Sequence, residues 1–125
     1  MIIEQSPGEV IDRLTILEIK LARISDPSLR RHVVVEHDRL LAALAASQAI
    51  EGVDSLRAEL KSVNESLWDV EDALRDHERR NEFGDMFVER ARSVYRLNDR
   101  RSAIKRLINE LAGSAVSDVK SYAPY

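Results

Sequence analysis

The feature that most constrains the fold is a regular apolar repeat in the middle of the chain. Six apolar residues recur there at alternating intervals of four and three, at Leu56, Leu60, Val63, Leu67, Val70 and Leu74. This alternation puts all six on one stripe of an α-helix, whereas a β-strand would divide them between its two faces. The repeat predicts an amphipathic helix from about Asp54 to Arg80 that buries the stripe against other helices.

A second helix is indicated near the start of the chain. Ser6 suits the N-cap, Pro7 suits the first helical position, and Glu9 has the spacing of a capping box. Its apolar stripe consists of Val10, Leu14, Leu17, Leu21 and Ile24. Ile16 and Ile19 project from the opposite side, so we expect a second neighbour there, either the C-terminal tail or another subunit.

Two further helices follow from turn signals. After a break at residues 25–27, a third apolar stripe is formed by Leu29, Val33, Leu40 and Leu44. That helix ends before Gly52, and a turn at residues 81–85 leads to another helix, from about Asp85 to Ala112. Gly113 is placed to end it.

The connections between these helices are short, which favours antiparallel neighbours. The predicted fold is all-α: an antiparallel up-and-down four-helix bundle in a single domain, residues 1–125, with a short non-helical C-terminal tail. The tail, SAVSDVKSYAPY, has no helical pattern, and its tyrosines and Val119 are apolar enough to dock on the bundle.

The amino-acid composition indicates the cellular compartment in which the protein works. The chain has no cysteine, which excludes disulfides and thiolate metal sites and fits a cytoplasmic protein. No apolar run approaches the roughly 20 residues of a membrane span, and the first residues lack the pattern of a signal peptide, so we expect no membrane span.

Charge is unevenly distributed along the chain. Residues 65–82 carry seven acidic and three basic side chains, whereas residues 90–106 carry seven basic side chains and one acidic side chain. Two antiparallel helices with these charges would attract one another. The basic helix lacks aromatic side chains for bases and the acidic helix opposes a phosphate backbone, so we expect no nucleic-acid partner.

Polar residues interrupt the apolar series of the last helix. One register runs through Phe87, Ala91, Val94, Asn98, Arg101, Lys105 and Ile108. A second register, which shifts sideways after Val94, runs through Leu97, Arg101, Ile104, Ile108 and Leu111. The first predicts a polar box inside the bundle. In the second, Asn98 and Lys105 lie at the margin and the head of Arg101 extends toward water.

The polar box would have companions on two other helices. The candidate ligand-binding residues are Arg13, Lys20, Asn64, Trp68, Glu71, Tyr95, Asn98, Arg101 and Lys105. Arg13, Arg101 and Lys105 could together hold a carboxylate or phosphate. In the alternative interpretation, Asp12 and Glu71 neutralise these bases in interhelical ion pairs.

Other chemistry has little support in the sequence. The four acids Glu65, Asp69, Asp72 and Asp76 share a helical face opposite the apolar stripe, so we expect that face to be solvated. The three histidines have no metal-ligand spacing, and we expect neither a metal nor a cofactor. No catalytic residue can be named, and whether the protein is an enzyme stays open.

Several segments resemble an uncharacterised bacterial family of small helical proteins, known only as a domain of unknown function. They are SPGEVIDRLTILEIK at residues 6–20, LWDVEDALRDHERR at residues 67–80, SVYRLNDRRSAIKRLIN at residues 93–109, and KSYAPY. The resemblance implies a bacterial cytoplasmic protein with no assigned reaction, connected with cell-envelope polysaccharide synthesis.

Two functions are therefore expected. The first is a binding or protein-interaction module that forms a homodimer. The alternative is a metal-free enzyme or sensor that binds a small anionic ligand in a polar pocket between the first, third and fourth helices.

Overall fold

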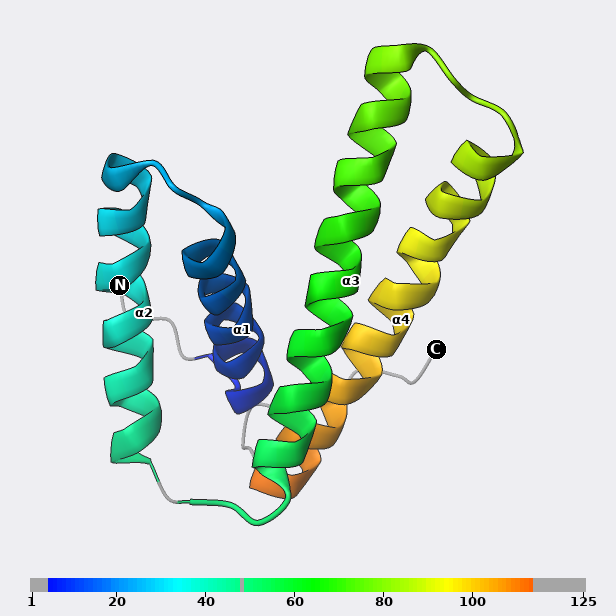
Figure 1. The fold of residues 1–125 in the computed structure, drawn as a ribbon. Coiled ribbons are helices and arrows are strands. Elements are labelled where there is room, and N and C mark those ends of the chain that lie inside the picture. Colours follow the sequence, from blue (N-terminus) through cyan, green and yellow to red (C-terminus); the bar gives the residue numbers. More distant parts are fainter. Residues whose placement is uncertain (1–4, 48, 114–125) are drawn as a thin grey trace.

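The computed structural model describes residues 5–47 and 49–113, and these residues form four α-helices (Figure 1). The helices are α1 (Pro7–Arg23), α2 (Pro27–Ala46), α3 (Val53–Arg80) and α4 (Asp85–Ala112). The predicted all-α, four-helix fold is confirmed, and the described ranges contain no strand. The predicted non-helical tail lies outside the described residues.

Local sequence signals set the helix ends. The Ser6 hydroxyl accepts a hydrogen bond from the Glu9 backbone N–H at 3.4 Å and begins α1. Asp26 caps α2 in the same way and is followed by Pro27 at the first helical position. Asn81 and Gly113 end α3 and α4 in the left-handed conformation, which satisfies carbonyl groups of the last turn.

The apolar core lies at one end of the α3–α4 hairpin, where α1 packs against both helices. Its buried members are Ile11, Leu60, Val63, Leu67, Ile104 and Ile108. The α3 repeat is thus buried in its middle, whereas Val70 and Leu74, nearer the α3–α4 turn, are only partly buried. The reason is that α1 spans 17 residues and α3 spans 28, so α1 covers only part of the hairpin.

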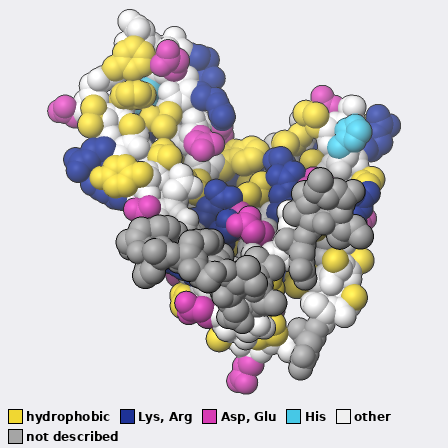
Figure 2. All heavy atoms as spheres, turned by 180° about the vertical axis from the view of Figure 1, so that it is seen from behind, with side chains coloured by type: hydrophobic (Ala, Val, Ile, Leu, Met, Phe, Trp, Pro, Cys, Tyr) yellow, Lys and Arg dark blue, Asp and Glu magenta, His cyan; other side chains and the backbone are white. Residues whose placement is uncertain are grey.

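The two helical hairpins diverge. Helix α2 packs against α1 and makes no helix-to-helix contact with α3 or α4. Figure 1 shows α2 as an outer arm, with the far ends of α3 and α4 projecting on the other side, and Figure 2 shows the surface hollowed between the two projections.

Helix α1 therefore occupies the centre of the molecule, with α2 on one side and α3 with α4 on another. This explains its two apolar faces: Ile19 is buried at 2% exposure and Ile16 is half-buried. The sequence predicts the C-terminal tail or another subunit as this second neighbour. The contacts of α1 show that neighbours within the chain account for both faces.

Candidate functional site

Arg101 and Asp12 form the centre of the contact between α4 and α1. The guanidinium donates from Nε to Asp12 Oδ1 at 2.9 Å and from a terminal nitrogen to Oδ2 at 2.5 Å. The side chain of Asp12 is 5% exposed and that of Arg101 is 29% exposed. Two parallel charge-assisted hydrogen bonds fix the geometry of such a pair. The head of Arg101 therefore points into the helix interface, not into water.

Lys105 and Asn109 continue this contact along α4. Lys105 Nζ lies 2.7 Å from a Glu9 carboxylate oxygen and 3.9 Å from Asp12 Oδ2. One turn further on, Asn109 Oδ1 accepts a hydrogen bond from the Gly8 backbone N–H at 2.8 Å. Residues four apart on α4 thus meet α1 residues in reverse order, as two antiparallel helices require.

Asn64 joins α3 to the same contact. Its amide nitrogen donates to Asp12 Oδ1 at 2.9 Å and to the Thr15 hydroxyl at 2.8 Å. Thr15 in turn donates to the backbone carbonyl of Asp12 at 2.8 Å. We call the whole set the polar seam, and its members are Gly8, Glu9, Asp12, Thr15, Asn64, Arg101, Lys105 and Asn109.

The polar seam is electrostatically satisfied. Burial alone would raise the pKa of Asp12, but the hydrogen bonds from Arg101 and Asn64, with the charge of Lys105, hold this pKa below its ordinary value. The hydrogen bond to Asp12 raises the pKa of Arg101 against the effect of burial. In the described part of the chain, no buried side-chain nitrogen or oxygen lacks a partner. The seam is therefore suited to joining three helices.

Three of the nine predicted ligand-binding residues meet in the polar seam: Asn64, Arg101 and Lys105. Arg13 instead turns to α2, where its guanidinium donates to both Glu36 carboxylate oxygens at 2.7 and 2.9 Å. Trp68 lies against the guanidinium of Arg23, 5.8 Å from the ring centre. The remaining four are half-buried or exposed: Lys20, Glu71, Tyr95 and Asn98.

Sequence reasoning missed Glu9 and Thr15 as members of this cluster. Glu9 was assigned to the capping box, but its carboxylate lies against Lys105. The spacing of Arg101 and Lys105 could have identified Glu9. Residues four apart on one helix reach residues three to four apart on an antiparallel neighbour, so a partner of Lys105 is expected three residues before Asp12.

The second of the two registers considered for α4 agrees better with the burial pattern. Ile104 and Ile108 are buried, Leu97 packs against the core, and Asn98 is exposed. The position of the Arg101 guanidinium differs from what either register predicts. The first register predicts that this group lines a pocket and the second that it extends into water, whereas it does neither.

Cavities also lie elsewhere among the described residues, and neither Arg101 nor Lys105 lines the three that follow. One of about 670 Å³ lies where α2 ends and α3 begins, and its wall includes Ile11, Leu44 and Ile108. Another, of about 700 Å³, lies at the α1–α2 turn.

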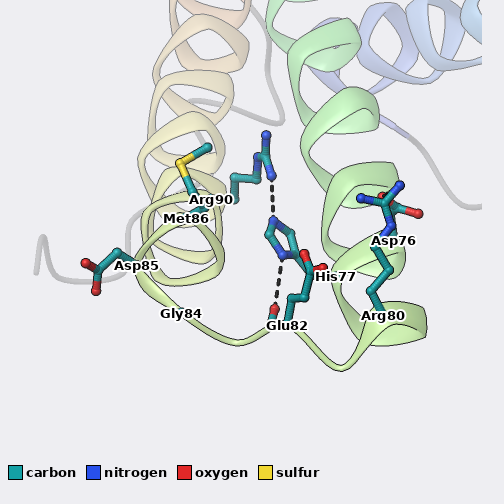
Figure 3. A pocket seen from close by; sticks show the side chains of 8 residues that line it. All are labelled: Asp76, His77, Arg80, Glu82, Gly84, Asp85, Met86 and Arg90. Carbon is teal, nitrogen blue, oxygen red and sulfur yellow. Dashed lines mark hydrogen bonds and ion pairs between the residues drawn. The ribbon is translucent and has the colours of Figure 1, made fainter.

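The third cavity, of about 410 Å³, lies at the α3–α4 turn, and Figure 3 shows His77 at its centre. His77 Nδ1 lies 3.0 Å from the Glu82 carbonyl oxygen, and Nε2 lies 2.5 Å from an Arg90 guanidinium nitrogen. A carbonyl can only accept and a guanidinium can only donate, so the ring carries its proton on Nδ1. The edge of His77 also packs against Phe87, with ring centres 5.8 Å apart. His77 therefore stabilises the α3–α4 turn.

Residues 5–47 and 49–113 contain no metal-binding group of side chains and no helix able to cross a membrane. Within those ranges, no three His, Cys, Asp or Glu side chains are grouped so as to hold a metal ion. None of the described helices combines the length and the apolar character that crossing a membrane demands.

The fold and the polar seam define a class of protein: a small all-helical protein in which an ion pair between α1 and α4, with hydrogen bonds from an asparagine of α3, joins three helices. The chain belongs to the family of unknown function DUF6165, which it matches over residues 1–124. No curated protein and no solved structure matches the chain. The segments at residues 6–20 and 93–109, singled out in the sequence, supply every member of the polar seam except Asn64.

Proposed function

We propose that this protein is an interaction module of the bacterial cytoplasm and that a protein partner binds the outward face of α2. The supporting observation is that α2 packs against α1 alone and leaves four large apolar side chains exposed. They are Leu29 at 53%, Val34 at 39%, Val35 at 58% and Leu41 at 39% exposure. Of these four, Val34 and Leu41 are seven residues apart and share the outward side of α2. Exposed apolar surface on a helix that has no neighbour there is typical of interaction sites.

The surface beside α2 also contains a recess. Val34 and Val35 line the cavity of about 700 Å³ at the α1–α2 turn, together with Pro27. Arg30 is fixed at this cavity, because its guanidinium donates to the carbonyl groups of Leu21 and Ile24. A partner would therefore meet a shallow, preformed recess with a mainly apolar surface, which lowers the entropic cost of binding.

The alternative, a metal-free enzyme or sensor for a small anion, needs cationic heads that are available to a ligand. Each of the three candidate cations, Arg13, Arg101 and Lys105, already lies against a carboxylate of the chain. An anionic ligand would have to displace that carboxylate, so the contacts favour the interaction module. Cell-envelope polysaccharide synthesis is the setting that we infer for the module from the resemblance of its sequence segments.

Site-specific cross-linking in cells tests the proposal. A photoreactive side chain at position 34 should form covalent adducts with protein, whereas the same group at His32 should not. The two positions lie about 200° apart around α2, and both native residues are exposed, so His32 is a matched control. Failure of position 34 to capture protein, or equal capture at both positions, would contradict the proposal.

A further inference from the structure

The outward face of α2 carries an apolar and charged series of its own. Its members recur at alternating intervals of four and three and are all exposed: Pro27, Arg31, Val34, Asp38, Leu41 and Ala45. We call this series the outer stripe. It differs from the series that faces α1, whose members Val33, Leu40 and Leu44 are half-buried. A helix with two such stripes is built to contact two helical neighbours.

We propose that the second neighbour of α2 is α2 of a second copy of this chain, lying antiparallel across the outer stripe. This inference rests on the proposed function and names its partner. In Figure 1, α2 is the outermost described helix on its side of the molecule. The helix has 20 residues, which gives it a length of about 30 Å and room for several layers of interhelical contact.

Charge determines the orientation of the pair. Arg31 precedes Val34 by three residues and Asp38 follows it by four, so the two opposite charges flank the apolar centre of the stripe. In an antiparallel pair, Arg31 of each copy comes within reach of Asp38 of the other. A parallel pair would instead set like charges against one another, which is destabilising.

The two charges are available for this contact. Among the described residues, Arg31 forms no ion pair, and Asp38, whose side chain is 70% exposed, contacts only the His37 ring at 3.2 Å. A two-fold symmetric interface requires one surface to complement itself. The arrangement of Arg31, Val34 and Asp38 meets this requirement, since it carries both signs of charge on either side of an apolar centre.

Charge reversal tests the inference in the full chain. Light scattering over a range of concentrations should give the mass of a dimer for the wild-type protein. Arg31→Asp and Asp38→Arg should each raise the dissociation constant at least tenfold, and the double variant should recover dimer, because it restores opposite charges at both contacts. The matched control is Arg39→Asp, an exposed arginine about 100° around the helix from Asp38, which should leave the dissociation constant unchanged.

The outcomes separate this inference from the proposed function. A wild-type monomer at every concentration would overturn the dimer, and cross-links from position 34 to another protein would still support the interaction module. A dimer unaffected by either reversal, or not recovered in the double variant although all variants fold, would overturn the α2 pairing. Circular dichroism of each variant establishes that it is folded.

Discussion

The two halves of the α3–α4 hairpin are held together by different means. The half beside α1 contains the buried apolar core and the polar seam, with Leu60 and Ile108 fully buried and Arg101 bound to Asp12. In the half nearer the turn, beyond Leu67, the only buried residue among those described is His77, at 8% exposure. One half is thus stabilised by packing on a third helix. The other is stabilised by contacts between two helices and their turn, including those of His77 with Glu82, Arg90 and Phe87.

This difference indicates where the protein can tolerate change. Removing a buried apolar or paired group costs several times more than changing an exposed one, because cavities and unpaired charges are created only where water is excluded. Stability should therefore depend on the half beside α1, and substitutions on the surfaces of α2 and of the α3–α4 turn should cost less.

The largest effect is expected at the ion pair of the polar seam. Arg101→Met keeps an apolar stem but leaves the buried Asp12 carboxylate without its bidentate partner, so unfolding free energy should fall by about 3–5 kcal/mol. Arg100→Met is the matched control. Arg100 is exposed and lies 3.3 Å from Glu59, and its loss should cost less than about 1 kcal/mol. Urea denaturation measures both, and equal costs would mean that the polar seam does not dominate this half.

The same pair predicts a response to acid. The pKa of Asp12 is depressed in the folded protein, so its stabilising contribution is complete above the unfolded-state pKa of about 4 and is lost as pH falls through the folded value. The stability difference between wild type and Arg101→Met should therefore narrow as pH is lowered from about 5 toward 3. Denaturation midpoints across this range give the measurement, and a constant difference would contradict the assigned pairing.

A pair of glycines compares the two halves directly. A Cβ at Gly8 would lie 2.6 Å from the backbone carbonyl oxygen of Lys105, whereas a Cβ at Gly84, beside the turn, meets nothing within 4 Å. Gly8→Ala should separate α1 from α4 and cost about 1–3 kcal/mol. Gly84 is the N-cap of α4, so Gly84→Ala should cost only the difference in cap preference, about 0.5–1 kcal/mol. Thermal unfolding distinguishes them, and a harmless Gly8→Ala would show that α1 can shift along α4.

Substitution of His77 should have a smaller effect on stability, limited to the half of the α3–α4 hairpin nearer the turn. His77→Ala removes the contacts with Arg90 and with the Glu82 carbonyl group, and should cost about 1–2 kcal/mol. Hydrogen exchange should accelerate in the residues around the α3–α4 turn and stay unchanged near Leu60. Faster exchange throughout both halves would mean that the hairpin unfolds as one unit.

Sequence patterns were sufficient for the helices but not for the contacts between them. The 4,3 repeat and the caps at Ser6 and Gly113 define helices because they act over a few residues. The divergence of α2 from α3 depends on packing angles that an apolar stripe does not encode. The partner of Arg101 was likewise undecided between Asp12 and Glu71, since helical spacing gives the face of a residue and not its depth along a neighbouring helix.

The smallest effect is expected at the cap of α1, the helix that joins the two hairpins. The Ser6 hydroxyl lies 3.4 Å from the Glu9 backbone nitrogen, a long hydrogen bond. The Glu9 carboxylate is turned toward Lys105, so the reciprocal half of the capping box is diverted into the polar seam. Ser6→Ala should therefore cost only about 0.5–1 kcal/mol, and Ser6→Thr, which keeps the hydroxyl, should retain most of the wild-type stability. Urea denaturation of both variants provides the test. If Ser6→Ala cost as much as Gly8→Ala, the cap would contribute as much to stability as the close contact between α1 and α4. That result would mean that Glu9 acts on the end of α1 and not on Lys105.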